Sequence, residues 1–154
     1  MEKFRRRTTE EILLKGTIDY LRGEQTFKAI MFKGAVKECK AYLTTERFVA
    51  CEESSLKMFG ALLLLISYFV AKKIVFEIPL DTLAAIGIPK EKGSQELFLQ
   101  RNDGAEFRIR LNSFFNAREK WIDTFSDAVK KVRPEVEIQE TETGIEFVQP
   151  AANA

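Results

Sequence analysis

The sequence predicts a mainly β protein of the α+β class, in which an antiparallel sheet or barrel is followed by one α-helix packed on its opening. Several short segments carry apolar residues at every second position, which is typical of strands with one buried and one solvated face. One longer stretch with apolar residues every three or four positions follows these segments. The 154 residues, with 45% hydrophobic and 31% charged residues, indicate a single folded domain.

The strongest strand signal is the strict alternation of apolar and charged residues from Glu106 to Leu111. Asn102-Asp103-Gly104 precedes it and predicts a tight hairpin turn, because an Asp-Gly step tolerates positive φ. Pro79 has no N–H for a strand ladder, so its strand should end there or lie at an edge. The eight predicted strands cover residues 11–18, 26–32, 38–43, 47–52, 74–80, 83–88, 97–99 and 106–111.

The predicted helix follows the strands, with Asn112 or Ser113 as its N-cap and Pro134 as its stop. Its apolar stripe consists of Phe114, Trp121, Phe125, Ala128 and Val132.

The two ends of the chain differ in charge from the predicted domain at residues 10–133. Residues 1–9 form a basic arm containing Arg5-Arg6-Arg7, and residues 134–154 form an acidic tail without Lys or Arg. We predict that both ends are loose, and that their opposite charges could bring them together. The alternative for the tail is a short extra strand, because apolar and polar residues alternate around Ile138 and Phe147.

An apolar run from Met58 to Ala71 does not fit an alternating β protein, because it is apolar around every face. As a helix it would reach about 21 Å, which is short of the ~30 Å hydrocarbon core of a bilayer. Three alternatives remain: burial within the monomer, self-association, and shallow insertion into a membrane with flanking lysines at the head groups. The predicted contact residues are Lys57, Phe59, Leu62, Leu63, Leu65, Ile66, Phe69, Lys72 and Lys73.

Three segments together resemble a known family. Residues 41–50 (AYLTTERFVA) are similar to the paired strands of GRAM domains and bacterial PH-like domains, and residues 76–83 (FEIPLDTL) resemble their next strand and turn. Residues 10–16 resemble the opening strand, so the likeness extends over about residues 10–132. The resemblance implies a bent antiparallel β-barrel of about seven strands, capped by a C-terminal helix that carries Trp121, with an apolar insert at about 56–72.

Such domains bind phosphoinositides, other lipids or proteins. Lys28, Lys33, Lys37 and Lys40 lie in the region where PH domains hold phosphoinositides, but interspersed lysines more often form a solvated face. We interpret Arg47 as a structural partner for a carboxylate or for carbonyl groups rather than as a ligand contact.

Several function classes lack their signals. The chain has no histidine, no phosphate-binding or dinucleotide-binding glycine loop, and no nucleophile elbow, so we expect no enzyme. Cys39 and Cys51 have neither redox nor zinc spacing, and we expect no metal or cofactor. A net charge of +1 without a basic and aromatic motif argues against nucleic-acid binding.

The remaining hypothesis is a non-catalytic binding module. No apolar stretch follows the basic N-terminus, so we expect a cytoplasmic protein that is peripheral on a membrane or bound to a protein. Its expected partners are an anionic or phosphoinositide-type lipid, or a protein, contacted through residues 58–71 and the flanking lysines. The alternative is a structural homo-oligomer whose 58–71 segment is the subunit interface and which has no lipid ligand.

Overall fold

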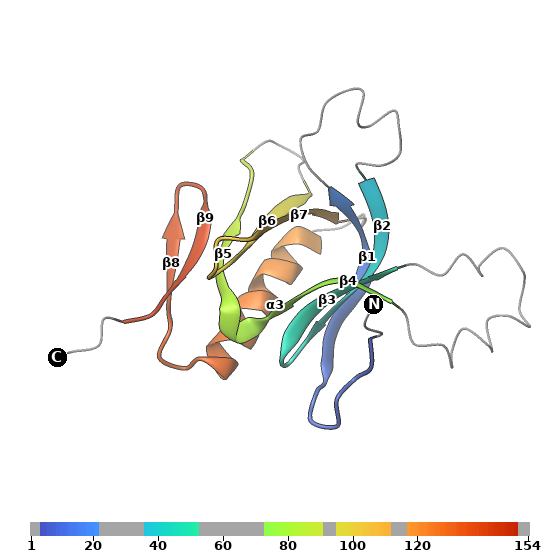
Figure 1. The fold of residues 1–154 in the computed structure, drawn as a ribbon. Helices are drawn as coiled ribbons and strands as arrows, with labels where there is room; N and C mark the ends of the chain where they lie inside the picture. The colour runs from blue at the N-terminus through green and yellow to red at the C-terminus, as the bar shows by residue number, and fades with distance from the viewer. Residues whose placement is uncertain (1–3, 22–35, 53–72, 91–94, 112–116, 151–154) are drawn as a thin grey trace, which may run out of the picture.

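The computed structural model describes residues 4–21, 36–52, 73–90, 95–111 and 117–150, and the description below is confined to them. These residues form one strongly curved antiparallel sheet and one α-helix (Figure 1). The strands are β1 (Ile12–Leu21), β2 (Val36–Thr44), β3 (Arg47–Glu52), β4 (Ile74–Pro79), β5 (Leu83–Gly87), β6 (Glu96–Arg101), β7 (Glu106–Leu111), β8 (Glu137–Thr141) and β9 (Gly144–Val148). A short 3₁₀ turn, η2 (Leu80–Thr82), precedes β5, and the helix is α3 (Ala117–Val132).

The sheet is bent but not closed. Its strand order is β4-β3-β2-β1-β7-β6-β5-β9-β8, and every pairing is antiparallel. Register shifts interrupt the ladders at the start of β1, at the end of β3 and at the start of β5. Such irregularities increase local twist and let a sheet curl. The mainly β fold with one C-terminal helix is confirmed, although the described residues hold nine strands rather than about seven.

The helix closes the bent sheet and completes its core. Figure 1 shows α3 lying between the two halves of the curved sheet, with the β8–β9 hairpin beyond β5. The Phe48 ring of β3 lies 6.1 Å from Trp121 and 5.3 Å from Phe125, both on α3. The predicted helix stripe is therefore confirmed at Trp121, Phe125 and Ala128, which are buried. It is wrong at Val132, which is 39% exposed because the helix ends there.

The predicted alternation of inward-facing and outward-facing residues in β7 is confirmed. Ile109 and Leu111 are buried, and the half-buried Phe107 ring stacks on Phe76 at 4.6 Å, from the opposite half of the sheet. The hairpin before β7 is confirmed too, since Gly104 has φ +91° and its N–H donates to the carbonyl of Arg101 at 3.0 Å. Pro79 is the last residue of β4, which is an edge strand of the described sheet.

Other sequence predictions fall outside the described residues. They are the strand at 26–32, the N-cap at Asn112 or Ser113, and Phe114 of the helix stripe. None of the helices in the described ranges is long and apolar enough to cross a bilayer.

The prediction of a loose acidic tail is wrong for residues 137–148. This segment forms the β8–β9 hairpin, and β9 pairs with β5 through Ala85 opposite Glu146 and Gly87 opposite Gly144. Phe147 and Val136, which directly precedes β8, are buried in the core. The strand alternative is correct, because burial of a few apolar side chains outweighs the repulsion between solvated glutamates on the other face.

The tight contact between β9 and β5 makes Gly144 sensitive to substitution. Its φ is +150°, and an added Cβ would overlap the backbone of Ile86. We expect Gly144→Ala to lower the free energy of unfolding by about 2–3 kcal/mol, from backbone strain and steric overlap. The control is Gly104→Ala, where φ is also positive but no atom lies within 4 Å of the added Cβ.

The control should cost only about 1 kcal/mol, from backbone strain alone. Urea unfolding followed by circular dichroism measures both variants. Equal losses would contradict the close approach of β9 to β5.

Candidate functional site

Of the predicted contact residues, the structure describes the one that directly precedes the edge strand β4. This residue is Lys73, and its side chain is exposed. The others lie outside the described residues: Lys57, Phe59, Leu62, Leu63, Leu65, Ile66, Phe69 and Lys72.

The two residues that flank the insert are hydrogen-bonded to each other. The backbone N–H of Glu52, the last residue of β3, donates to the carbonyl of Lys73 at 2.8 Å. The positions that flank residues 53–72 are therefore adjacent, at the edge of the sheet formed by β4.

Two cations on the neighbouring strands are paired with acids. Lys37 Nζ on β2 lies 2.6 Å from Glu52 Oε1, and Arg110 Nη2 on β7 lies 2.7 Å from Asp19 Oδ2 on β1. The interpretation of Lys37 as part of a solvated face is therefore only partly right, since it is half-buried in an ion pair. A phosphate that bound Lys37 would therefore have to displace a carboxylate.

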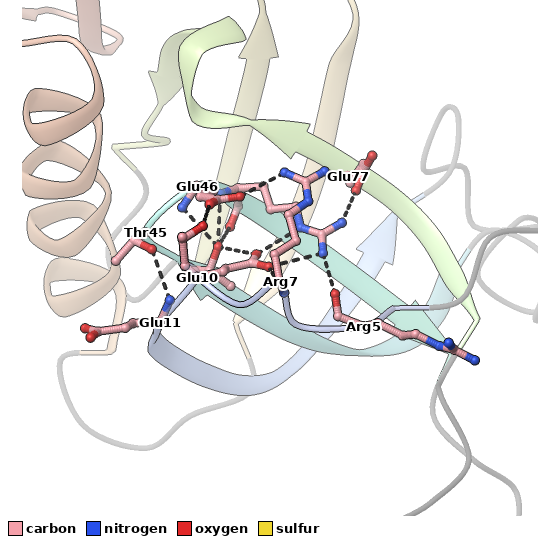
Figure 2. Close-up of polar contacts among 10 residues, drawn as sticks. Arg5, Arg7, Glu10, Glu11, Thr45, Glu46 and Glu77 are labelled. Carbon is pink, nitrogen blue, oxygen red and sulfur yellow. Dashed lines mark hydrogen bonds and ion pairs between the residues drawn. The ribbon is translucent and has the colours of Figure 1, made fainter.

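Arg47 has a structural role, as its position in the sequence predicts. Its side chain is 4% exposed, and its Nε donates to Glu10 Oε1 at 2.9 Å. Its Nη1 donates to Glu77 Oε2 at 2.7 Å and its Nη2 to the carbonyl of Arg5 at 2.9 Å (Figure 2). The guanidinium thus ties β4 and the N-terminal residues to the start of β3, and its donors point at protein acceptors.

Glu10 is the buried anion of this network and is only 1% exposed. Burial raises the pKa of its carboxyl, but donors from Arg47, the Arg7 N–H and Thr44, together with the charge of Arg47, outweigh burial and hold the pKa below 4.5. The Thr44 hydroxyl lies 2.7 Å from Glu10 Oε1, and its oxygen accepts the N–H of Arg47 at 3.0 Å. The Thr44 hydroxyl thus bonds to both the buried carboxylate and the local backbone.

The prediction of a loose N-terminal arm is wrong for residues 4–9. The Phe4 ring stacks on Tyr42 of β2 at 4.9 Å, and Arg7 Nη1 lies 2.9 Å from Glu46 Oε2 at the β2–β3 turn (Figure 2). Within the part of the chain that the structure describes, the arm therefore contacts the β2–β3–β4 side of the sheet and not the acidic C-terminal segment. The opposite net charges of the two ends favoured a contact between them. In the structure, the buried Glu10 carboxylate directly after the arm pairs with Arg47, and Arg47 also donates to the carbonyl of Arg5 within the arm.

A second candidate site, which the sequence analysis missed, is a groove of about 560 Å³ beside the C-terminal hairpin. It is lined by residues of β5, β6 and β9, by the first residue of β7 and the last of β8, and by residues 88–90 and 142–143. Ile86, Leu99 and Ile145 are buried on the core side, so their strand neighbours Ala85, Gln100 and Glu146 point to the outer face. The sequence does show small or polar residues at these alternate positions. However, only the strand pairing shows that they lie side by side.

No protein-family model matches this chain, and no curated protein matches it in sequence. Solved structures match it in fold. The N-terminal PH domain of human ARAP2 aligns with a TM-score of 0.54 and 12% identity over 83% of this chain and 88% of that domain. The Slm1 PH domain in complex with inositol-4-phosphate aligns with a TM-score of 0.52 and 10% identity over 77% of this chain and 95% of that one.

The DH/PH fragment of PDZRHOGEF, in complex with human RhoA, aligns with a TM-score of 0.55 and 10% identity. The match covers 80% of this chain but only 30% of that longer chain. Likeness at such low identity concerns the fold alone. The predicted PH-like fold is confirmed, and membership of the GRAM family stays a prediction.

Proposed function

We propose that this chain is a non-catalytic PH-like binding module that docks on an anionic membrane surface. The contact is made by the apolar run at 58–71 with Lys57, Lys72 and Lys73. The observation that carries the proposal is the point of attachment: twenty residues, most of them apolar, are inserted between adjacent positions at the edge of a PH-like sheet. We further propose that the protein is cytoplasmic and peripheral on the membrane.

The neighbouring folds support this class of function. Slm1, of the same fold, was solved with inositol-4-phosphate, and the PDZRHOGEF fragment was solved with RhoA, so lipid and protein partners are both compatible with such a sheet. The ion pairs of Lys37 and Arg110 leave these two cations engaged, which favours the insert over a head-group pocket as the contact. For this reason we propose surface docking in preference to recognition of one phosphoinositide.

The expected energetics divide unevenly between the two parts of the insert. Each lysine near an anionic surface contributes at most about 1 kcal/mol. Each fully buried leucine or phenylalanine contributes about 1.5–3 kcal/mol. The apolar side chains should therefore contribute more to the free energy of binding than the lysines, whose contribution falls as the salt concentration rises.

Vesicle flotation tests the proposal. The chain should float with vesicles of phosphatidylcholine and phosphatidylserine, and much less with phosphatidylcholine alone. Leu63→Asp should reduce the bound fraction at least about tenfold, because a carboxylate in the acyl region is strongly disfavoured. The matched control is Ile138→Asp on β8, where the native side chain is 40% exposed, and it should float like the wild type.

The absence of recruitment, or equal recruitment of wild type and Leu63→Asp, would rule out membrane docking. A phosphoinositide added to the vesicles tests the narrower ligand class. If Leu63→Asp unfolds the chain while Ile138→Asp does not, the run is part of the core and the proposal fails.

The same apolar run favours one alternative function, a structural homo-oligomer, because a large exposed apolar surface commonly marks an interface. Light scattering separates the two functions. A dimer that Leu63→Asp converts to a monomer would support the interface. A monomer at high micromolar concentration would eliminate it.

A further inference from the structure

The groove beside the C-terminal hairpin is built from two neighbouring rows of outward-facing residues. Strand pairing sets Glu106, Gln100, Ala85 and Glu146 opposite one another in one row, on β7, β6, β5 and β9. The next row contains Phe98, Gly87 and Gly144. All of these residues line the groove.

The residues in the middle of the groove are small and apolar, so they leave open space above the sheet. Ala85 and Gly87 lie on the central strand β5, and Gly144 lies beside Gly87 on β9. The half-buried Phe98 ring stands next to them, with the guanidinium of Arg108 5.3 Å from its centroid. This floor can accept the aliphatic part of a side chain lying across the strands.

The two ends of the first row carry carboxylates. Glu106 and Glu146 are exposed, and within the described residues neither side chain forms a hydrogen bond or an ion pair. Glu142 also lines the groove, and Lys90 is the only cation among the described residues that line it. The charge therefore favours a cationic occupant.

The spacing of these carboxylates fits an extended polypeptide. Three strand intervals separate Glu106 from Glu146, which corresponds to about 14 Å at the usual strand spacing. Side chains at positions i and i+4 of an extended peptide are separated by about 13 Å, on the same face. A peptide lying across the strands can thus place one cation at each carboxylate and its middle side chain between Gln100 and Ala85.

We propose that this groove is a docking site for an extended basic segment of a partner protein, with Lys or Arg at positions i and i+4. Each basic side chain pairs with Glu106 or Glu146, and the residue between them packs on Ala85 and Gly87 beside Phe98. The strands β5 and β9 that line the groove are far from β4 in the strand order, and the proposal is independent of the membrane function proposed above.

Fluorescence anisotropy at low ionic strength tests the proposal with the full chain. The probe is a fluorescein-labelled peptide in which Ser-Leu-Ser separates two arginines, and the control peptide has the same composition with the arginines adjacent. We expect the spaced peptide to bind at least about fivefold more tightly, because only it reaches both carboxylates. The double change Glu106→Gln with Glu146→Gln should weaken its binding at least about tenfold.

The matched control makes the same charge change outside the groove. Glu137 and Glu140 are exposed on β8 and do not line it, so Glu137→Gln with Glu140→Gln should change the affinity less than about twofold. Ala85→Leu fills the floor without any change of charge and should also weaken binding. It serves as a second test if the glutamine variants fail to fold, as judged by circular dichroism.

Three results would overturn the proposal. They are no binding of the spaced peptide, equal binding of the two peptides, and equal losses in the two double-glutamine variants. Equal losses would indicate general attraction to an acidic surface. Leu63→Asp should bind the spaced peptide like the wild type, so failure of the membrane proposal would leave this result unchanged.

Discussion

Replacing Arg47 by methionine is expected to lower the free energy of unfolding by about 3–5 kcal/mol. The reason is the Glu10 carboxylate, which would remain buried after losing the cation that lies 2.9 Å away. Methionine fills much of the same volume, so the loss reports the charge rather than a cavity. Urea unfolding at neutral pH measures the effect.

The pH dependence distinguishes this cause from a packing defect. In the wild type, the folded-state pKa of Glu10 lies below its ordinary value of 4.5. Its contribution to stability is therefore complete above that value and is lost as the pH falls through the lower folded pKa. In Arg47→Met, burial without the cation should raise the folded pKa, so protonation should narrow the gap between variant and wild type as the pH falls. A gap that stays constant would indicate a packing defect.

Arg7→Met is the matched control for Arg47→Met. It removes an ion pair to Glu46 from the same region, but the Arg7 side chain is 58% exposed. We expect a loss of only about 0.5 kcal/mol, as is usual for solvated ion pairs. Equal losses in the two variants would contradict the assignment of Arg47 and Glu10 as the buried pair that holds the N-terminal residues.

Phe125→Ala is the second change with a large expected effect. Phe125 is fully buried on α3, and its ring lies 5.3 Å from Phe48 and 6.2 Å from Trp121. Truncation removes contacts between the helix and the sheet and leaves a cavity, which typically costs about 3–5 kcal/mol for phenylalanine. Thermal and urea unfolding measure the loss.

The control for Phe125→Ala lies on the same helix. Val132→Ala truncates an apolar side chain that is 39% exposed at the C-terminal end of α3, and it should cost less than about 1 kcal/mol. A small loss in Phe125→Ala would show that α3 does not complete the core. The fold would then depend on the sheet alone.

The sequence predicted the parts of this fold that depend on local pattern. The alternation from Glu106 to Leu111 predicted a strand and its buried face, and Asp103-Gly104 predicted the turn. The spacing of Trp121 and Phe125 predicted the helix face that meets the sheet. Each of these signals is contained within a few consecutive residues, so no knowledge of distant residues was needed.

The candidate sites were harder to predict because they join residues that are far apart in the chain. Arg47 was expected to have a carboxylate partner, but nothing local indicates that the partner is Glu10, across the first hairpin. The groove depends on β5 lying between β6 and β9, a neighbourhood that only the strand pairing shows. The alternation that signals the hairpin at 137–148 was present, but the acidic composition favoured a solvated tail.

The amino-acid sequence by itself determined which segments become strands, turns and helix, because periodic burial and backbone preference act over a few residues. Tertiary structure alone decided that β1 pairs with β7 and β5 with β9. It also decided that Glu10 neutralises Arg47, and that Glu106 and Glu146 face one groove. These outcomes depend on how distant segments pack against one another, since the energy of a buried charge or an apolar contact is set by neighbours in space.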